Sequence, residues 1–133
     1  MSRLPLVLVA AAVALLLAGC GGDDREEVEQ TVRDFVRATD HRDVDTFCGE
    51  LVSEEYLEQS TGTTGNKAKD ACKDQLRAIT GLRIALVRIR KTEIDGDRAA
   101  VTAVLKTQGR RDVRQLRLSK EGGDWKLAGG RGQ

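Results

Sequence analysis

Apolar side chains recur every three or four residues in the first half of the chain after residue 24, which is the spacing of amphipathic helices. Asp24 and Glu27 have the spacing of a capping box, so a first helix is expected to begin there. A second helix is predicted from Asp43, then a short turn capped by Ser53, and a third helix over 66–81 with Asn66 as its cap. The inward positions of these helices are Val28, Val32, Phe35, Val36 and Thr39; Val44, Phe47, Cys48 and Leu51; and Ala68, Cys72, Leu76 and Ile79.

The period changes to two after Gly81, as expected for strands with one buried face. Leu82, Ile84 and Leu86 alternate in one parity and Val87 and Ile89 in the other, which predicts a bulge near Leu86. Turns are predicted at 95–96, 108–109 and 121–124, because glycine favours hairpin connections. The clearest alternating strand places Ala99, Val101, Ala103 and Leu105 on one face. The fold class is therefore α+β, with three N-terminal helices packed on a curved antiparallel sheet of about four strands.

The N-terminal residues are predicted to be a targeting signal and not part of this domain. Residues 4–18 are an apolar run of 15 residues after Arg3, shorter than the roughly 20 that span a bilayer, as in a secretory signal. The segment 17–20, Leu-Ala-Gly-Cys, resembles the bacterial lipobox, which implies cleavage before Cys20 and a diacylglyceryl thioether, with a further acyl group such as palmitate, on that cysteine. Simple secretion and an uncleaved anchor are the alternatives.

These features divide the chain into four parts. Residues 1–19 are expected to be a lipoprotein signal peptide, and 20–23 the lipidated cysteine and a tether. The folded domain is expected over 24–129, with a tail at 130–133. The expected location is the extracytoplasmic face of the cell membrane, since the lipid on Cys20 would anchor the chain there.

Two further cysteines, Cys48 and Cys72, remain once Cys20 is acylated. An even pair in an oxidising compartment favours a disulfide, and both residues fall on apolar helix faces. The alternatives are two separate buried thiols or a catalytic thiol, for which no partner base is visible. The chain has one histidine and no C-x-x-C motif, so no metal site and no cofactor are expected.

The net charge of +1 hides an asymmetry between the two halves. Residues 21–81 hold 8 Lys/Arg against 15 Asp/Glu, and residues 82–133 hold 13 against 6. Either the halves complement each other, or a basic surface faces anionic lipid or an acidic partner. The densest basic run alternates between two strand faces and is either a solvated edge or a contact surface: Arg110, Arg111, Arg114, Arg117 and Lys120. Nucleic acid is not expected as a partner, because four aromatic residues are too few for a stacking platform.

The order of the predicted elements, with Arg-Asp-Val-Asp at 42–45 and Gly-Gly-Asp-Trp-Lys-Leu at 122–127, resembles the nuclear-transport-factor-two-like superfamily over residues 24–129. These α+β cones include ketosteroid isomerase and polyketide cyclases, and the resemblance implies a pocket that holds an Asp, His or Tyr in the enzymes. The candidates here are Asp40, His41, Asp43 and Tyr56. Three of them also have an ordinary interpretation: His41 as a solvated helix end, Asp43 as an N-cap and Tyr56 as packing.

No catalytic dyad can be assembled from these residues, so the leading hypothesis is a non-enzymatic lipoprotein module that binds a small apolar ligand or an envelope protein. One alternative is a small pocket enzyme of the isomerase or cyclase type that uses His41 or a nearby acid. Another is a structural accessory subunit of an envelope complex, with homodimerisation through the sheet as a further option. A buried histidine or carboxylate facing a cavity would favour the enzyme, and a filled cone would favour an interaction role.

Overall fold

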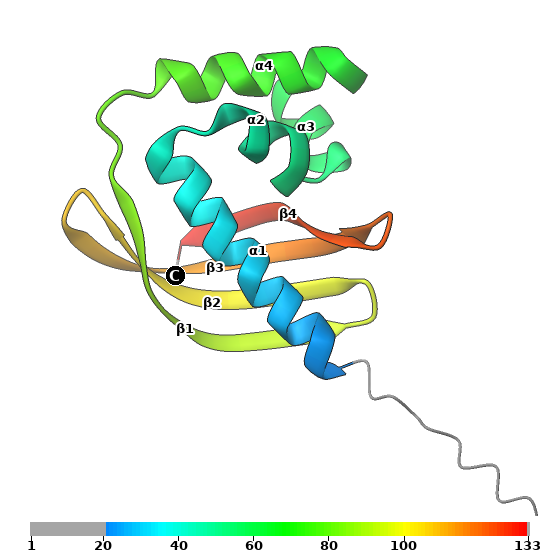
Figure 1. Cartoon of the computed structure of the whole chain (residues 1–133), viewed down its shortest axis with the longest axis vertical. Coiled ribbons are helices and arrows are strands. Elements are labelled where there is room, and N and C mark those ends of the chain that lie inside the picture. The colour runs from blue at the N-terminus through cyan, green and yellow to red at the C-terminus, as the bar shows by residue number, and fades with distance from the viewer. Residues whose placement is uncertain (1–20, 133) are drawn as a thin grey trace, which may run out of the picture.

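A computed structural model describes residues 21–132, so Cys20 and the predicted signal peptide lie outside it (Figure 1). The helical part comprises α1 (Gly21–His41), α2 (Val44–Thr46), the π-helix η1 (Phe47–Leu51), α3 (Glu54–Thr61) and α4 (Gly65–Ala78). The strands that follow are β1 (Ile84–Asp95), β2 (Arg98–Thr107), β3 (Arg110–Glu121) and β4 (Asp124–Gly132). The predicted α+β class, with helices first and strands after, is confirmed.

The four strands form one antiparallel sheet in the order β1-β2-β3-β4, each joined to the next by a hairpin. The turn at Gln108-Gly109 has φ values of 51° and 80°, the left-handed pair that a tight hairpin needs. The predicted bulge is present between Leu86 and Arg88, and a second shift follows between Ile89 and Lys91. Bulges bend the strand that carries them, so β1 curves around the helical side.

Helix α1 crosses one face of the sheet, as Figure 1 shows, and fills the concavity with its apolar stripe. Val28 and Val32 are fully buried, and they belong to one cluster with Val101 and Ala103 of β2 and Leu118 of β3. Trp125 closes the cluster on β4. The cone interior on this side is therefore packed with side chains, as expected for an ordinary core.

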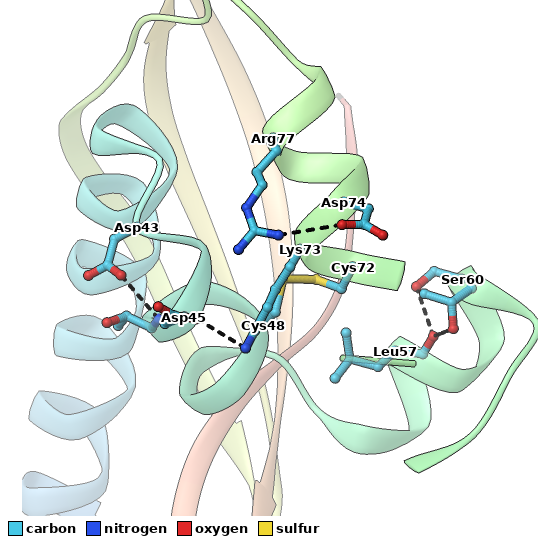
Figure 2. Close-up of a disulfide and its surroundings, with 11 residues drawn as sticks. Asp43, Asp45, Cys48, Leu57, Ser60, Cys72, Lys73, Asp74 and Arg77 are labelled. Carbon is cyan, nitrogen blue, oxygen red and sulfur yellow. Dashed lines mark hydrogen bonds and ion pairs between the residues drawn. A yellow bond between two sulfur atoms is a disulfide. The ribbon is translucent and has the colours of Figure 1, made fainter. Parts of the chain in front are cut away.

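A second, smaller core joins the helices that follow α1, and Val52 links it to the edge of β4. It consists of Cys48, Val52, Leu57, Ala68 and Cys72, and Phe47 packs against it. Figure 2 shows the disulfide between Cys48 of η1 and Cys72 of α4, with a Cα–Cα separation of 5.9 Å. The predicted disulfide is thus confirmed. It joins η1 to α4 through the apolar faces on which both cysteines were predicted to lie.

Several predicted boundaries are wrong, each for a local reason. Helix α1 includes Gly21, so Asp24 lies inside the helix and residues 21–23 are helical where a tether was expected. Asn66 does not cap α4, because Gly65 is already helical and Thr64 takes the N-cap position. The helix ends at Ala78, which leaves Ile79 46% exposed rather than inward. Strand β4 continues into the predicted tail because Gly132 pairs with Arg114.

Candidate functional site

A groove of about 440 Å³ lies between α3 and the sheet face that points away from α1, called the outer face below. Ala100, Arg117 and Ser119 point to that face, because they alternate along their strands with residues that α1 covers. The parallel bridge between Val52 and Leu127 brings the chain along the edge of β4 just before α3 begins. The volume falls within the range of small-molecule sites.

The groove has a floor of small side chains and walls of larger ones. Ala100, Ser119 and Ala128 form the floor across β2, β3 and β4, and Tyr56 and Gln59 of α3 stand on one side. Ser53 fixes this wall, since its hydroxyl accepts a hydrogen bond from Tyr56 N at 3.1 Å and its own amide donates to Leu127 O at 2.8 Å. The predicted cap at Ser53 is confirmed, and it positions α3 beside the sheet.

Arg117 lies across the backbone of Gly129 inside this groove. A Cβ atom at Gly129 would lie 3.1 Å from Arg117 Nη2, and the residue has φ 149°, a value that side chains other than glycine rarely adopt. Glycine is therefore required here both for its backbone and for the close approach of the guanidinium. Within the described chain, neither Arg117 nor Arg98 forms an ion pair or a side-chain hydrogen bond. Two guanidinium groups in the groove are therefore available to bind a ligand.

Acidic side chains line the other end of the groove. Glu93 and Asp95 come from the end of β1 and Glu55 from α3. Glu93 pairs with Lys91 at 2.5 Å. The groove therefore presents cations, acids, hydroxyls and an aromatic ring around a small apolar floor, which suits recognition of an amphiphilic molecule rather than a purely apolar one.

The candidate catalytic residues do not come together. Asp40 is structural: it accepts a hydrogen bond from Ile84 N at 2.9 Å and pairs with Arg83 at 3.4 Å, joining the end of α1 to β1. The His41 side chain is 68% exposed. Asp43 caps α2 by accepting from Thr46 N at 3.2 Å, and these hydrogen bonds to Thr46 hold the pKa of Asp43 below its usual value. Tyr56 alone of the four lines the groove.

Asp24 does not cap α1 as predicted but binds two side chains of the sheet. Its carboxylate accepts hydrogen bonds from Lys120 Nζ at 3.1 Å and Trp125 Nε1 at 3.3 Å, which clamps the start of α1 to β3 and β4. The hydrogen bond from Lys120 lowers the pKa of Asp24, and the same bond raises the pKa of Lys120. Both shifts favour the charged forms, so the ion pair is intact across the neutral pH range.

The predicted basic surface divides between the two sheet faces, as the strand parity indicated. Lys120 is taken up by the Asp24 clamp, and Arg114 pairs with Asp112 at 2.7 Å. Arg111 and Arg117 point to the outer face, Arg117 at the groove and Arg111 at the opposite end of β3. The basic run of β3 is therefore not one contact surface.

The described range, 21–132, carries no candidate metal site and no candidate membrane-spanning helix. No cluster of His, Cys, Asp or Glu in this range is arranged to hold a metal ion. None of the helices described is both long and apolar enough to cross a membrane.

No protein-family model matches the chain, and no curated protein matches it in sequence. Solved structures do. A protein from Kribbella flavida (Kfla4162) aligns with a TM-score of 0.61 at 14% identity, over 85% of this chain and 91% of that one. A protein of unknown function with a cystatin-like fold from Nostoc punctiforme aligns with a TM-score of 0.54 at 14% identity, over 80% and 87%.

A third structure, a function-unknown protein from Mycobacterium tuberculosis, aligns with a TM-score of 0.51 at 16% identity, over 90% of this chain and 76% of that one. Likeness at this level of identity shows the fold alone. It agrees with the α+β fold class that the sequence predicted.

Proposed function

We propose that this protein is a lipid-anchored extracytoplasmic binding module that holds a small amphiphilic anion in the groove between α3 and the outer face. The observation that carries the proposal is the guanidinium of Arg117, lying without an acidic partner over Gly129 in the groove. An arginine fork recognises carboxylate, sulfonate and phosphate groups through paired hydrogen bonds. The ring of Tyr56 and the alanine floor would receive the apolar part of the ligand.

Binding without catalysis is supported by what the helix side of the sheet contains. The interior that the resemblance to isomerases would assign to a reaction is packed by Val28, Val32 and Trp125. His41, the one imidazole in the chain, is exposed at the far end of α1. A general acid or base must reach its substrate, and of the candidates Asp40, His41, Asp43 and Tyr56 only Tyr56 lines the groove.

The anchor part of the proposal rests on the lipobox-like segment ending at Cys20 and on the disulfide. A disulfide between Cys48 and Cys72 is stable in an oxidising compartment such as the cell envelope. A signal segment followed closely by a folded domain fits export and retention at the membrane.

Arg117→Gln is expected to weaken binding of the anionic dye 8-anilinonaphthalene-1-sulfonate by about tenfold, since a charge-assisted hydrogen bond is worth about 1.5–3 kcal/mol. Dye fluorescence titrated with the purified full chain measures the dissociation constant. Arg77→Gln is the matched control, because Arg77 is an exposed cation on α4 whose partner is Asp74. Equal affinity of the two variants would contradict the assignment of the groove as an anion site.

A further inference from the structure

The half of the outer face next to the β2–β3 turn carries three cations around two valines. Arg88 lies opposite Val104, and Val104 lies opposite Val113, so the three residues cross the sheet in one row. Lys106 lies opposite Arg111 in the adjoining row. We call these five residues the Arg/Val face. Its cations are exposed, whereas Val104 is only 9% exposed and Val113 is half-buried.

The three cations of the Arg/Val face make no contact with another described residue that would stabilise the fold. In the described part of the chain, none of Arg88, Lys106 and Arg111 forms an ion pair or a side-chain hydrogen bond. The direct opposition of Lys106 and Arg111 places two like charges across a hairpin, which destabilises a sheet. A cationic rim around an apolar centre, rich in arginine, is the composition of a protein interface.

The Asp24 clamp places the start of α1 at the end of the sheet opposite the Arg/Val face. Asp24 follows Cys20 by four residues, which span at most about 14 Å. Asp24 contacts Lys120, and Arg111 precedes Lys120 by nine residues of β3, a distance of about 30 Å. Attraction between exposed charges fades over about 8 Å at physiological salt.

The end of the sheet near Asp24 is acidic. The turn that joins β1 to β2 carries Asp95 and Asp97, and the turn that joins β3 to β4 carries Glu121 and Asp124. An anionic bilayer repels these four side chains and attracts Arg98 and Arg117 of the groove, so a domain anchored at this end gains little net attraction by lying with its outer face on the membrane. The Arg/Val face is then open to the aqueous side.

We propose that the Arg/Val face docks an acidic segment of a second envelope protein. Arg88 and Arg111 would pair with carboxylates of that segment, and the half-buried Val113 would contact its apolar side chains. Only the exclusion of the membrane as occupant rests on the proposed anchor at Cys20; the docking surface itself does not.

The test is binding of a fluorescent poly-glutamate peptide to the purified full chain, followed by anisotropy at two salt concentrations. Arg88→Glu combined with Arg111→Glu is expected to weaken binding by at least about tenfold. Lys67→Glu combined with Lys69→Glu changes the net charge equally on exposed positions of α4 and is expected to leave affinity within about twofold. Since Arg111→Glu faces Lys106, the first variant should melt no lower than the parent chain.

Three results would overturn the proposal. Equal losses in the two variants would mean that net charge alone attracts the peptide. If the Arg88 and Arg111 reversals abolish binding to phosphatidylglycerol vesicles but leave peptide binding unchanged, the face would be assigned to lipid. A dimer of the parent chain that sediments as a monomer after the Arg88 and Arg111 reversals would assign it to a second copy. If Cys20 carries no lipid yet the reversals abolish peptide binding, the docking face stands and the anchor falls.

Discussion

Reducing the Cys48–Cys72 disulfide is expected to lower the free energy of unfolding by about 3.5 kcal/mol in the chain-entropy account of a loop of this length. The melting temperature should fall by roughly 15 °C for a domain of this size. The reason is partly local, because α4 packs chiefly on the other helices and buries only Ala68, Cys72 and Leu76. Thermal melts with and without reductant measure the effect.

Hydrogen exchange shows which elements lose stability when the disulfide is reduced. Amides of α4 should lose protection first on reduction, while those of β2 and β3 stay protected, because the sheet belongs to the other core. The Cys48→Ala, Cys72→Ala double variant is the control and should not respond to reductant. Asp45→Asn breaks the ion pair with Lys73 at 3.0 Å, which Figure 2 also draws, and should cost little because Asp45 is 80% exposed. A reduced protein as stable as the oxidised one would contradict this account of α4.

Leu116→Ala is expected to destabilise the domain by about 3 kcal/mol, as deletion of a buried leucine leaves a cavity that a packed core closes only in part. Leu116 is 6% exposed and belongs to the cluster between α1 and the sheet. Its methyl group also lies against Gly130, where a Cβ atom would come within 3.2 Å of Leu116 Cδ2. Chemical denaturation of the variant and the parent chain measures the difference.

The same substitution tests whether the cone is filled. Val87→Ala is the control, since Val87 is 39% exposed and its loss should change stability by no more than about 0.5 kcal/mol. Dye binding in the groove should be unchanged in the Leu116 variant, because Leu116 faces α1 and does not line the groove. A cost below about 1 kcal/mol would mean that the interior has room for a ligand, and would revive the pocket-enzyme hypothesis.

Periodicity predicted the fold well because burial leaves a repeating mark on the sequence. Val28, Val32 and Val36 follow a helical stripe, and Ala99 and Val101 follow strand alternation; all five are buried. Capping patterns were less informative. Asp24 has the spacing of a capping box, yet its carboxylate is used by Lys120 and Trp125. Those partners lie about a hundred residues away, and no local pattern encodes such a contact.

The candidate site was not predicted, because it is built from outward positions of elements that are distant in sequence. Tyr56 and Arg117 were each singled out, but nothing in their spacing shows that α3 passes beside β3 and β4. The signal that was present is Gly129, a glycine inside a strand, which often marks close approach of another group. Here that group is Arg117.

Intact-mass analysis of the protein isolated from membranes, with and without reduction, tests most directly whether this is an anchored, disulfide-linked envelope module. We expect loss of residues 1–19, a lipid mass on Cys20 and a gain of two hydrogens on reduction of Cys48–Cys72. A full-length chain with three free thiols would contradict this expectation. The signal peptide would then be uncleaved, Cys20 would carry no lipid, and the protein would not have passed through an oxidising compartment.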